Sequence, residues 1–231
     1  MTELLHDLLF SPFFGLTLSA LAWCLGVYVQ KKTGWVLCNP LVIATALVIL
    51  VLTLFHIPLE AYNQGGSLIK LMLGPATAVL ALNIYRQRTA LKQYFIPVLT
   101  GCLVGSLTSV VCVLALCELF TMDGALTASL LPKSVTTAIA VGIAESRGGI
   151  PGIAAAAVVF TGIIGAVFAP AFAKLFHITD PVAEGLAIGA CSHALGTTKA
   201  LELGEVQGAM SSIAICVCGI FTSVLVLFIP A

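Results

Sequence analysis

The sequence predicts an all-α protein embedded in a membrane, with about seven or eight transmembrane segments. Of its 231 residues, 60% are hydrophobic and 9% are charged, and the mean hydropathy is +1.13. Soluble domains carry about 25% charged residues, so a chain this apolar cannot cover a folded surface with enough polar groups to stay in water. Its apolar runs also approach the roughly 20 residues that cross a bilayer as a helix. We therefore treat residues 1–231 as one integral membrane domain.

Charge and cysteine usage exclude several classes of function. Ten basic and ten acidic residues cancel, so no basic field indicates nucleic-acid binding. The eight cysteines lie mostly in apolar runs without metal-ligand spacing, which favours small buried hydrophobic side chains over metal ligands. No nucleophile, base and acid occur together in a pattern typical of a membrane enzyme. We expect no metal, no cofactor and no enzymatic activity.

The predicted spans follow from the apolar runs and the polar residues that end them. The acidic start of the chain lacks the basic residues of a secretory signal peptide, so the first run is expected to be a retained span. A polar loop over 60–66 is expected between the second and third spans. In chain order the spans are predicted over 10–30, 40–55, 68–85, 94–119, 126–144, 153–176, 183–203 and 210–229.

Basic residues predict the orientation, because they favour cytoplasmic loops. They follow the first, third and fifth predicted spans, at Lys31, Lys32, Arg86, Arg88, Lys92 and Arg147. These loops fall on one side if the spans alternate, which places the N-terminus outside. If segment 183–203 crosses the membrane, both ends of the chain lie outside. If this segment re-enters instead, the C-terminus lies inside.

Prolines near the start of three apolar segments suggest a repeat. Aligning Pro40 with Pro132 places Thr45 on Thr137, and the two spans would run in opposite directions. Opposed halves of this kind are typical of transporters with inverted repeats and broken helices. The repeat halves would cover about 10–92 and 93–231.

A cation and three hydroxyl side chains interrupt the apolar sequence after Pro132. A proline is tolerated in the first turn of a helix, so Pro132 is interpreted as a helix start. A helix N-terminus offers free N–H groups and a partial positive charge, which suit an anion. We therefore predict a carboxylate-binding site at Lys133, Ser134, Thr136 and Thr137. In the alternative interpretation, Lys133 extends to the lipid headgroups and the hydroxyls bond to backbone carbonyls.

A second polar cluster, over residues 189–202, is predicted to complete this site. Its candidate substrate-binding residues are Ser192, His193, Thr197 and Thr198. His193 titrates near neutral pH in water and is a candidate for proton coupling. The alternative is a packed helix whose histidine is satisfied by a neighbouring carbonyl group.

A third segment contains a glycine–proline pair inside an apolar run. Gly74 and Pro75 predict a kink or a break in the helix. Thr77 and Asn83, which follow this pair, are further candidate substrate-binding residues. A kink without any role in binding is the alternative.

These three segments resemble the signature blocks of the CidB/LrgB family of bacterial membrane proteins. The blocks read LGPATAVLALNIYRQR, LLPKSVTTAIAVGIAESRGG and GACSHALGTTKALELG, and the resemblance runs through nearly the whole chain. It implies a multi-pass protein of the bacterial inner membrane. The orientation predicted from the basic residues then places the N-terminus in the periplasm. Ala138 stands where the family often carries proline, which leaves the predicted site intact.

The resemblance implies two different functions. The family was described as modulating murein hydrolase activity and autolysis, by analogy with holins and antiholins, beside a small CidA/LrgA-type membrane partner. Similar proteins export glycolate and import glycerate in plastids, or are linked to pyruvate uptake in bacteria. We expect transport of a small monocarboxylate of the glycolate, glycerate or pyruvate type, because one cation and several hydroxyls suit a single carboxylate. The alternative is a holin- or antiholin-like regulator. Separately from the resemblance, a homodimer is expected from small-residue spacings such as that of Gly101 and Gly105.

Overall fold

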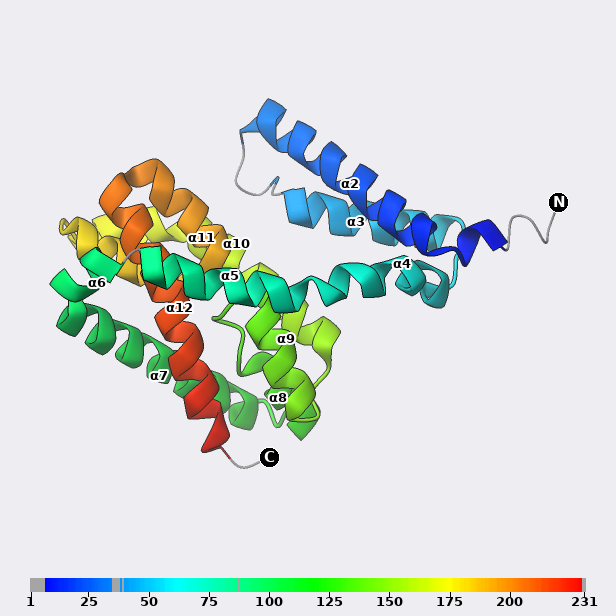
Figure 1. Cartoon of the computed structure of the whole chain (residues 1–231). Coiled ribbons are helices and arrows are strands. Elements are labelled where there is room, and N and C mark those ends of the chain that lie inside the picture. The colour runs from blue at the N-terminus through cyan, green and yellow to red at the C-terminus, as the bar shows by residue number, and fades with distance from the viewer. Residues whose placement is uncertain (1–6, 35–37, 39, 87, 230–231) are drawn as a thin grey trace. The chain divides into compact units, whose positions relative to one another are not determined.

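The computed structural model describes residues 7–34, 38, 40–86 and 88–229; residues 73, 76, 77, 80, 81, 83, 84 and 170 are described by backbone alone. Within this part of the chain all regular elements are helices, which confirms the predicted all-α class (Figure 1). The chain divides into two compact units, Met1–Ala76 and Thr77–Ala231. The single membrane domain and the inverted repeat stay predictions.

The first unit contains three helices, α2 (Pro12–Thr33), α3 (Pro40–Leu54) and α4 (Leu59–Leu71). The Ser11 side chain caps the start of α2 by accepting a hydrogen bond from the Phe13 N–H. Helices α2 and α4 pack so closely that a Cβ at Gly15 would collide with the backbone of α4.

The polar loop predicted over 60–66 is wrong, because these residues belong to α4. Ala61 and Gly65 are spaced four residues apart and are both buried, whereas Asn63 and Gln64 are exposed. Four-residue spacing places side chains on one face of a helix. The polar residues therefore form the outer face of an amphipathic helix.

The boundary between the two units falls within α5 (Leu73–Arg86), and the helices that follow α5 belong to the second unit. These are α6 (Arg88–Gln93), α7 (Phe95–Leu119), α8 (Gly124–Leu130), α9 (Thr137–Ser146), α10 (Pro151–Leu175), α11 (Pro181–Leu203) and α12 (Glu205–Leu227). Helix α12 is the most buried of the candidate spans, and it packs against both α11 and α7. Its Met210 and Ile213 form a core cluster with Val98 and Cys102 of α7.

Four helices in the described part of the chain are long and apolar enough to cross a membrane. They are Pro12–Thr33, Phe95–Leu119, Pro151–Ala169 and Glu205–Leu227. Pro40–Leu54 and Thr137–Ser146 are shorter apolar helices. These helices support a multi-pass membrane protein. The other predicted spans correspond to shorter or interrupted helices.

The continuous helix predicted over 126–144 is broken, and the prediction that Pro132 starts a helix is wrong. Helix α8 ends at Leu130, and turns followed by a bend occupy residues 131–135. Thr136 then caps α9 with an extended backbone (φ −67°, ψ 151°). Proline has no N–H, and its ring clashes with the carbonyl four residues earlier in a helix. Pro132 therefore follows the end of one helix rather than beginning the next.

Helix α11 contains a second break, at His193. Its backbone (φ 41°, ψ −137°) is not helical. A positive φ is uncommon for a residue other than glycine and costs about 1–3 kcal/mol, so the surrounding structure has to stabilise it. The two breaks confirm the expectation that the fold contains discontinuous helices.

Replacing Gly189 by alanine is expected to destabilise the pair formed by α11 and α12. A Cβ at this position would lie 2.8 Å from the Ser211 Cα and would collide with the Ser211 carbonyl oxygen. Forcing atoms into packed space costs about 1–3 kcal/mol. The midpoint of thermal unfolding in detergent should fall in Gly189→Ala. Gly142→Ala is the control, because a Cβ there meets open space. Equal midpoints for the two variants would contradict this packing.

Candidate functional site

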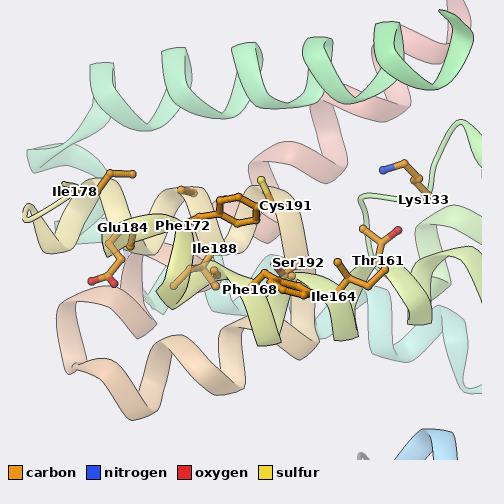
Figure 2. A pocket seen from close by; sticks show the side chains of 14 residues that line it. Lys133, Thr161, Ile164, Phe168, Phe172, Ile178, Glu184, Ile188, Cys191 and Ser192 are labelled. Atoms are coloured by element: carbon orange, nitrogen blue, oxygen red, sulfur yellow. The ribbon is translucent and has the colours of Figure 1, made fainter. Parts of the chain in front are cut away.

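Both helix breaks contribute to one cavity of about 560 Å³ in the second unit (Figure 2). Lys133 comes from the turns between α8 and α9, and Cys191 and Ser192 precede the break in α11. Helix α10 supplies seven of the fourteen lining residues. The complete lining is Lys133, Thr161, Ile164, Gly165, Phe168, Ala169, Phe172, Ala173, Ile178, Glu184, Ala187, Ile188, Cys191 and Ser192.

Lys133 supplies a positive charge to the cavity wall. Its ammonium nitrogen lies 3.4 Å from the Ser134 Oγ, which lies 2.7 Å from the Ser109 Oγ of α7. Within the described ranges, no acidic side chain forms an ion pair with Lys133. A cation in apolar surroundings is costly unless an anion or hydrogen-bond acceptors compensate it. This position is therefore suited to the carboxylate of a ligand.

Ser192 supplies a hydroxyl that lacks a partner. Its side chain is completely buried, and its Oγ has no hydrogen bond to any described residue. An unsatisfied buried polar group costs about 1–3 kcal/mol. Gly165 of α10 makes room for this side chain, because a Cβ there would collide with Ser192. A buried hydroxyl that has not formed its hydrogen bond therefore belongs to a residue of the cavity lining.

His193 stabilises the break in α11. Its Nε2 lies 2.8 Å from the carbonyl oxygen of Val158 on α10, so this nitrogen carries the proton and donates. Thr197 donates to the His193 carbonyl at 2.9 Å and pairs with the Ser211 Oγ at 2.6 Å. A contact between the histidine and a carbonyl is what the packed-helix interpretation expects. Proton coupling by His193 stays a prediction.

Of the eight predicted site residues whose side chains are described, six lie outside the cavity lining. Ser134 is buried and paired with Ser109, and the Thr136 Oγ1 has no partner among the described residues. Thr137 begins α9, whereas Thr198 is exposed and donates to the Leu195 carbonyl. The side chains of Thr77 and Asn83 lie outside the described residues. Of the ten predicted residues, Lys133 and Ser192 share the cavity.

Sequence reasoning missed the contribution of α10. Thr161, Ile164, Phe168 and Phe172 recur at intervals of three or four residues, which places them along one face of the helix. This spacing was available in the sequence, but any helix in a membrane also carries apolar residues at these intervals. The signal therefore did not distinguish a cavity wall from a lipid-facing surface.

The cavity has polar ends and an apolar middle. Figure 2 shows Lys133 at one end of the lining and Glu184 near the other, with Phe168 and Phe172 between them. The Glu184 Oε2 accepts a hydrogen bond from Gln207 at 3.2 Å. Such an arrangement can hold an anionic group beside Lys133 and an apolar group against the aromatic wall.

Comparisons with known proteins agree with the resemblance found in the sequence. The curated relatives include proteins named antiholin-like protein LrgB from Bacillus mycoides (strain KBAB4), Bacillus cereus (strain B4264) and Bacillus anthracis (strain CDC 684 / NRRL 3495). Each is 40% identical over 222 residues, which cover 95% of this chain and 96% of the relative. No solved structure matches the chain. Residues 19–231 match the model of the LrgB-like family, and the chain therefore belongs to that family.

Proposed function

We propose that this protein is an antiholin-like membrane protein. The support is the name of relatives that are 40% identical over nearly their whole length. This role was the alternative in the sequence analysis, and the comparisons favour it over transport. The proposal includes a location in the bacterial inner membrane, an N-terminus in the periplasm and a small LrgA-type membrane protein as partner.

The cavity favours a second candidate, the transport of a small monocarboxylate. The observation that carries this candidate is the Lys133 ammonium at the wall of a 560 Å³ cavity, without an acidic partner among the described residues. A carboxylate would compensate the cation, and the Ser192 hydroxyl would donate to the same ligand. Discontinuous helices that line a cavity are typical of secondary transporters, in which the breaks bind the substrate.

Transport is tested by uptake into proteoliposomes. Wild-type protein is expected to take up labelled glycolate, glycerate or pyruvate saturably. Lys133→Gln should reduce this uptake by roughly tenfold or more, because a charge-assisted hydrogen bond contributes about 1.5–3 kcal/mol. Lys174→Gln is the control, because Lys174 is exposed near the end of α10 and does not line the cavity. No saturable uptake of any of the three acids, with or without the partner, would reject the carrier and leave the antiholin-like role.

The antiholin-like role is tested separately in cells. Expression of the protein should slow autolysis, followed as the fall in culture turbidity after detergent is added. If this role depends on helix packing alone, Lys133→Gln should retain the effect while losing uptake. Expression that leaves the rate of autolysis unchanged would contradict the antiholin-like role. Loss of both activities in Lys133→Gln, with normal protein levels, would indicate that regulation depends on the cavity.

Cys191 provides a test of binding that does not depend on transport. Its thiol is exposed and lines the cavity, whereas Cys24 is exposed on α2 in the first unit. In variants that retain one of these cysteines, a saturating monocarboxylate should slow maleimide labelling of Cys191 by about fivefold or more and leave Cys24 unchanged. A fivefold effect corresponds to about 80% occupancy by a ligand that blocks access. Equal rates with and without the acid would show that the ligand does not occupy this cavity.

A further inference from the structure

We infer that the Lys133 cavity selects monocarboxylates with an apolar body and rejects acids that carry a second carboxylate. This inference rests on the carrier candidate above and specifies its substrate class. Four observations lead to it: the size of the cavity, the chemistry of its middle, the polar groups at its Lys133 end, and the acidic residue at its far end.

The cavity is large for a three-carbon acid. Its volume of about 560 Å³ lies within the roughly 300–1,000 Å³ typical of sites for drug-sized ligands. A molecule as small as pyruvate would contact Lys133 and leave most of the apolar wall without a partner. Longer acids would fill more of this space.

The middle of the cavity offers apolar contacts rather than hydroxyl partners. Phe168 and Phe172 lie one helical turn apart on α10, with ring centroids 6.3 Å apart. Ile164 and Ile188 line the same region. Each CH₂ group moved from water to an apolar surface strengthens binding by roughly fourfold. A hydroxylated tail would lose its water partners here without finding new ones.

The carboxylate end is defined by two independent features. Lys133 supplies the charge, and the fully buried Ser192 supplies a hydroxyl without a partner in the described part of the chain. A carboxylate bound beside Lys133 would compensate its charge, and the Ser192 hydroxyl has a hydrogen bond left to donate at the same cavity. This orientation directs the rest of the ligand along α10 and α11.

Glu184 opposes a second negative charge. It lies eight residues before Ser192 on α11, which is about 12 Å along the helix axis. The Glu184 carboxylate accepts a hydrogen bond from the neutral amide of Gln207. Among the described residues, no cation forms an ion pair with Glu184. Like charges repel more strongly beside an apolar wall than in water. A dicarboxylate that reaches from Lys133 toward Glu184 is therefore disfavoured.

The test measures the affinity of the purified full-length protein in nanodiscs, by calorimetry, for three probes. Pyruvate is the short acid, 2-oxohexanoate adds an apolar tail, and 2-oxoadipate has the same number of carbons with a second carboxylate at its end. Wild-type protein should bind 2-oxohexanoate at least about tenfold more tightly than pyruvate, since three added CH₂ groups are partly buried. It should bind 2-oxoadipate at least about tenfold more weakly than 2-oxohexanoate.

Matched variants assign each preference to its residue. Phe168→Ala, and the milder Phe168→Leu, should reduce the preference for 2-oxohexanoate over pyruvate, whereas Phe160→Ala on the same helix should not. Phe160 is exposed and does not line the cavity. Glu184→Gln should tighten 2-oxoadipate binding by about fivefold or more and leave pyruvate unchanged. Glu205→Gln, an exposed acid outside the lining, should change neither.

The possible results distinguish failure of the proposed selectivity from failure of the carrier candidate. Failure of wild-type protein to bind any of the three acids would reject the carrier candidate itself. Binding of pyruvate without a gain for 2-oxohexanoate would overturn the apolar selectivity and leave the carrier intact. Equal affinities for 2-oxohexanoate and 2-oxoadipate, or no effect of Glu184→Gln on 2-oxoadipate, would overturn the role of Glu184.

Discussion

The second unit depends on how its interrupted helices satisfy their backbone and side-chain polar groups inside an apolar environment. A bilayer offers no water to an unpaired N–H or C=O group, so non-helical backbone is tolerated only where protein or a cavity surrounds it. The break at His193 meets this requirement through its ring, which donates to the Val158 carbonyl, and through Thr197, which donates to the His193 carbonyl. The turn at 131–135 is tied to α7 by the pair of Ser134 with Ser109.

These contacts also explain how α10 can lie close beside the break in α11. Gly162 and Gly165 face α11, and a Cβ at either position would collide with His193 or Ser192. The two glycines let the interrupted part of α11 approach α10 closely enough for the histidine to reach a backbone carbonyl. The close contact buries Ser192 completely at the cavity wall. The cavity is thus a consequence of the packing that stabilises the break.

The sequence predicted the long helices well, because a run of about 20 apolar residues has few other outcomes in a membrane. It misplaced the start of the helix at Pro132, since a proline suits both the first turn of a helix and the position after its end. Lys133 and Ser192 were identifiable as polar residues in apolar sequence. Phe168 and Glu184 were not, because their place in the lining depends on how α10 and α11 pack, which no local pattern encodes.

Lys133 separates the two candidate functions in physical terms. A half-buried ammonium without an acidic partner in the described residues lowers stability, and an apolar side chain of similar length would pack there at less cost. Helix packing by itself gains nothing from this charge. Residues that break the rules of stability are expected where a site needs them. The Lys133 cation is therefore explained physically if an anion binds in the cavity. A regulatory role for the protein is compatible with such a site.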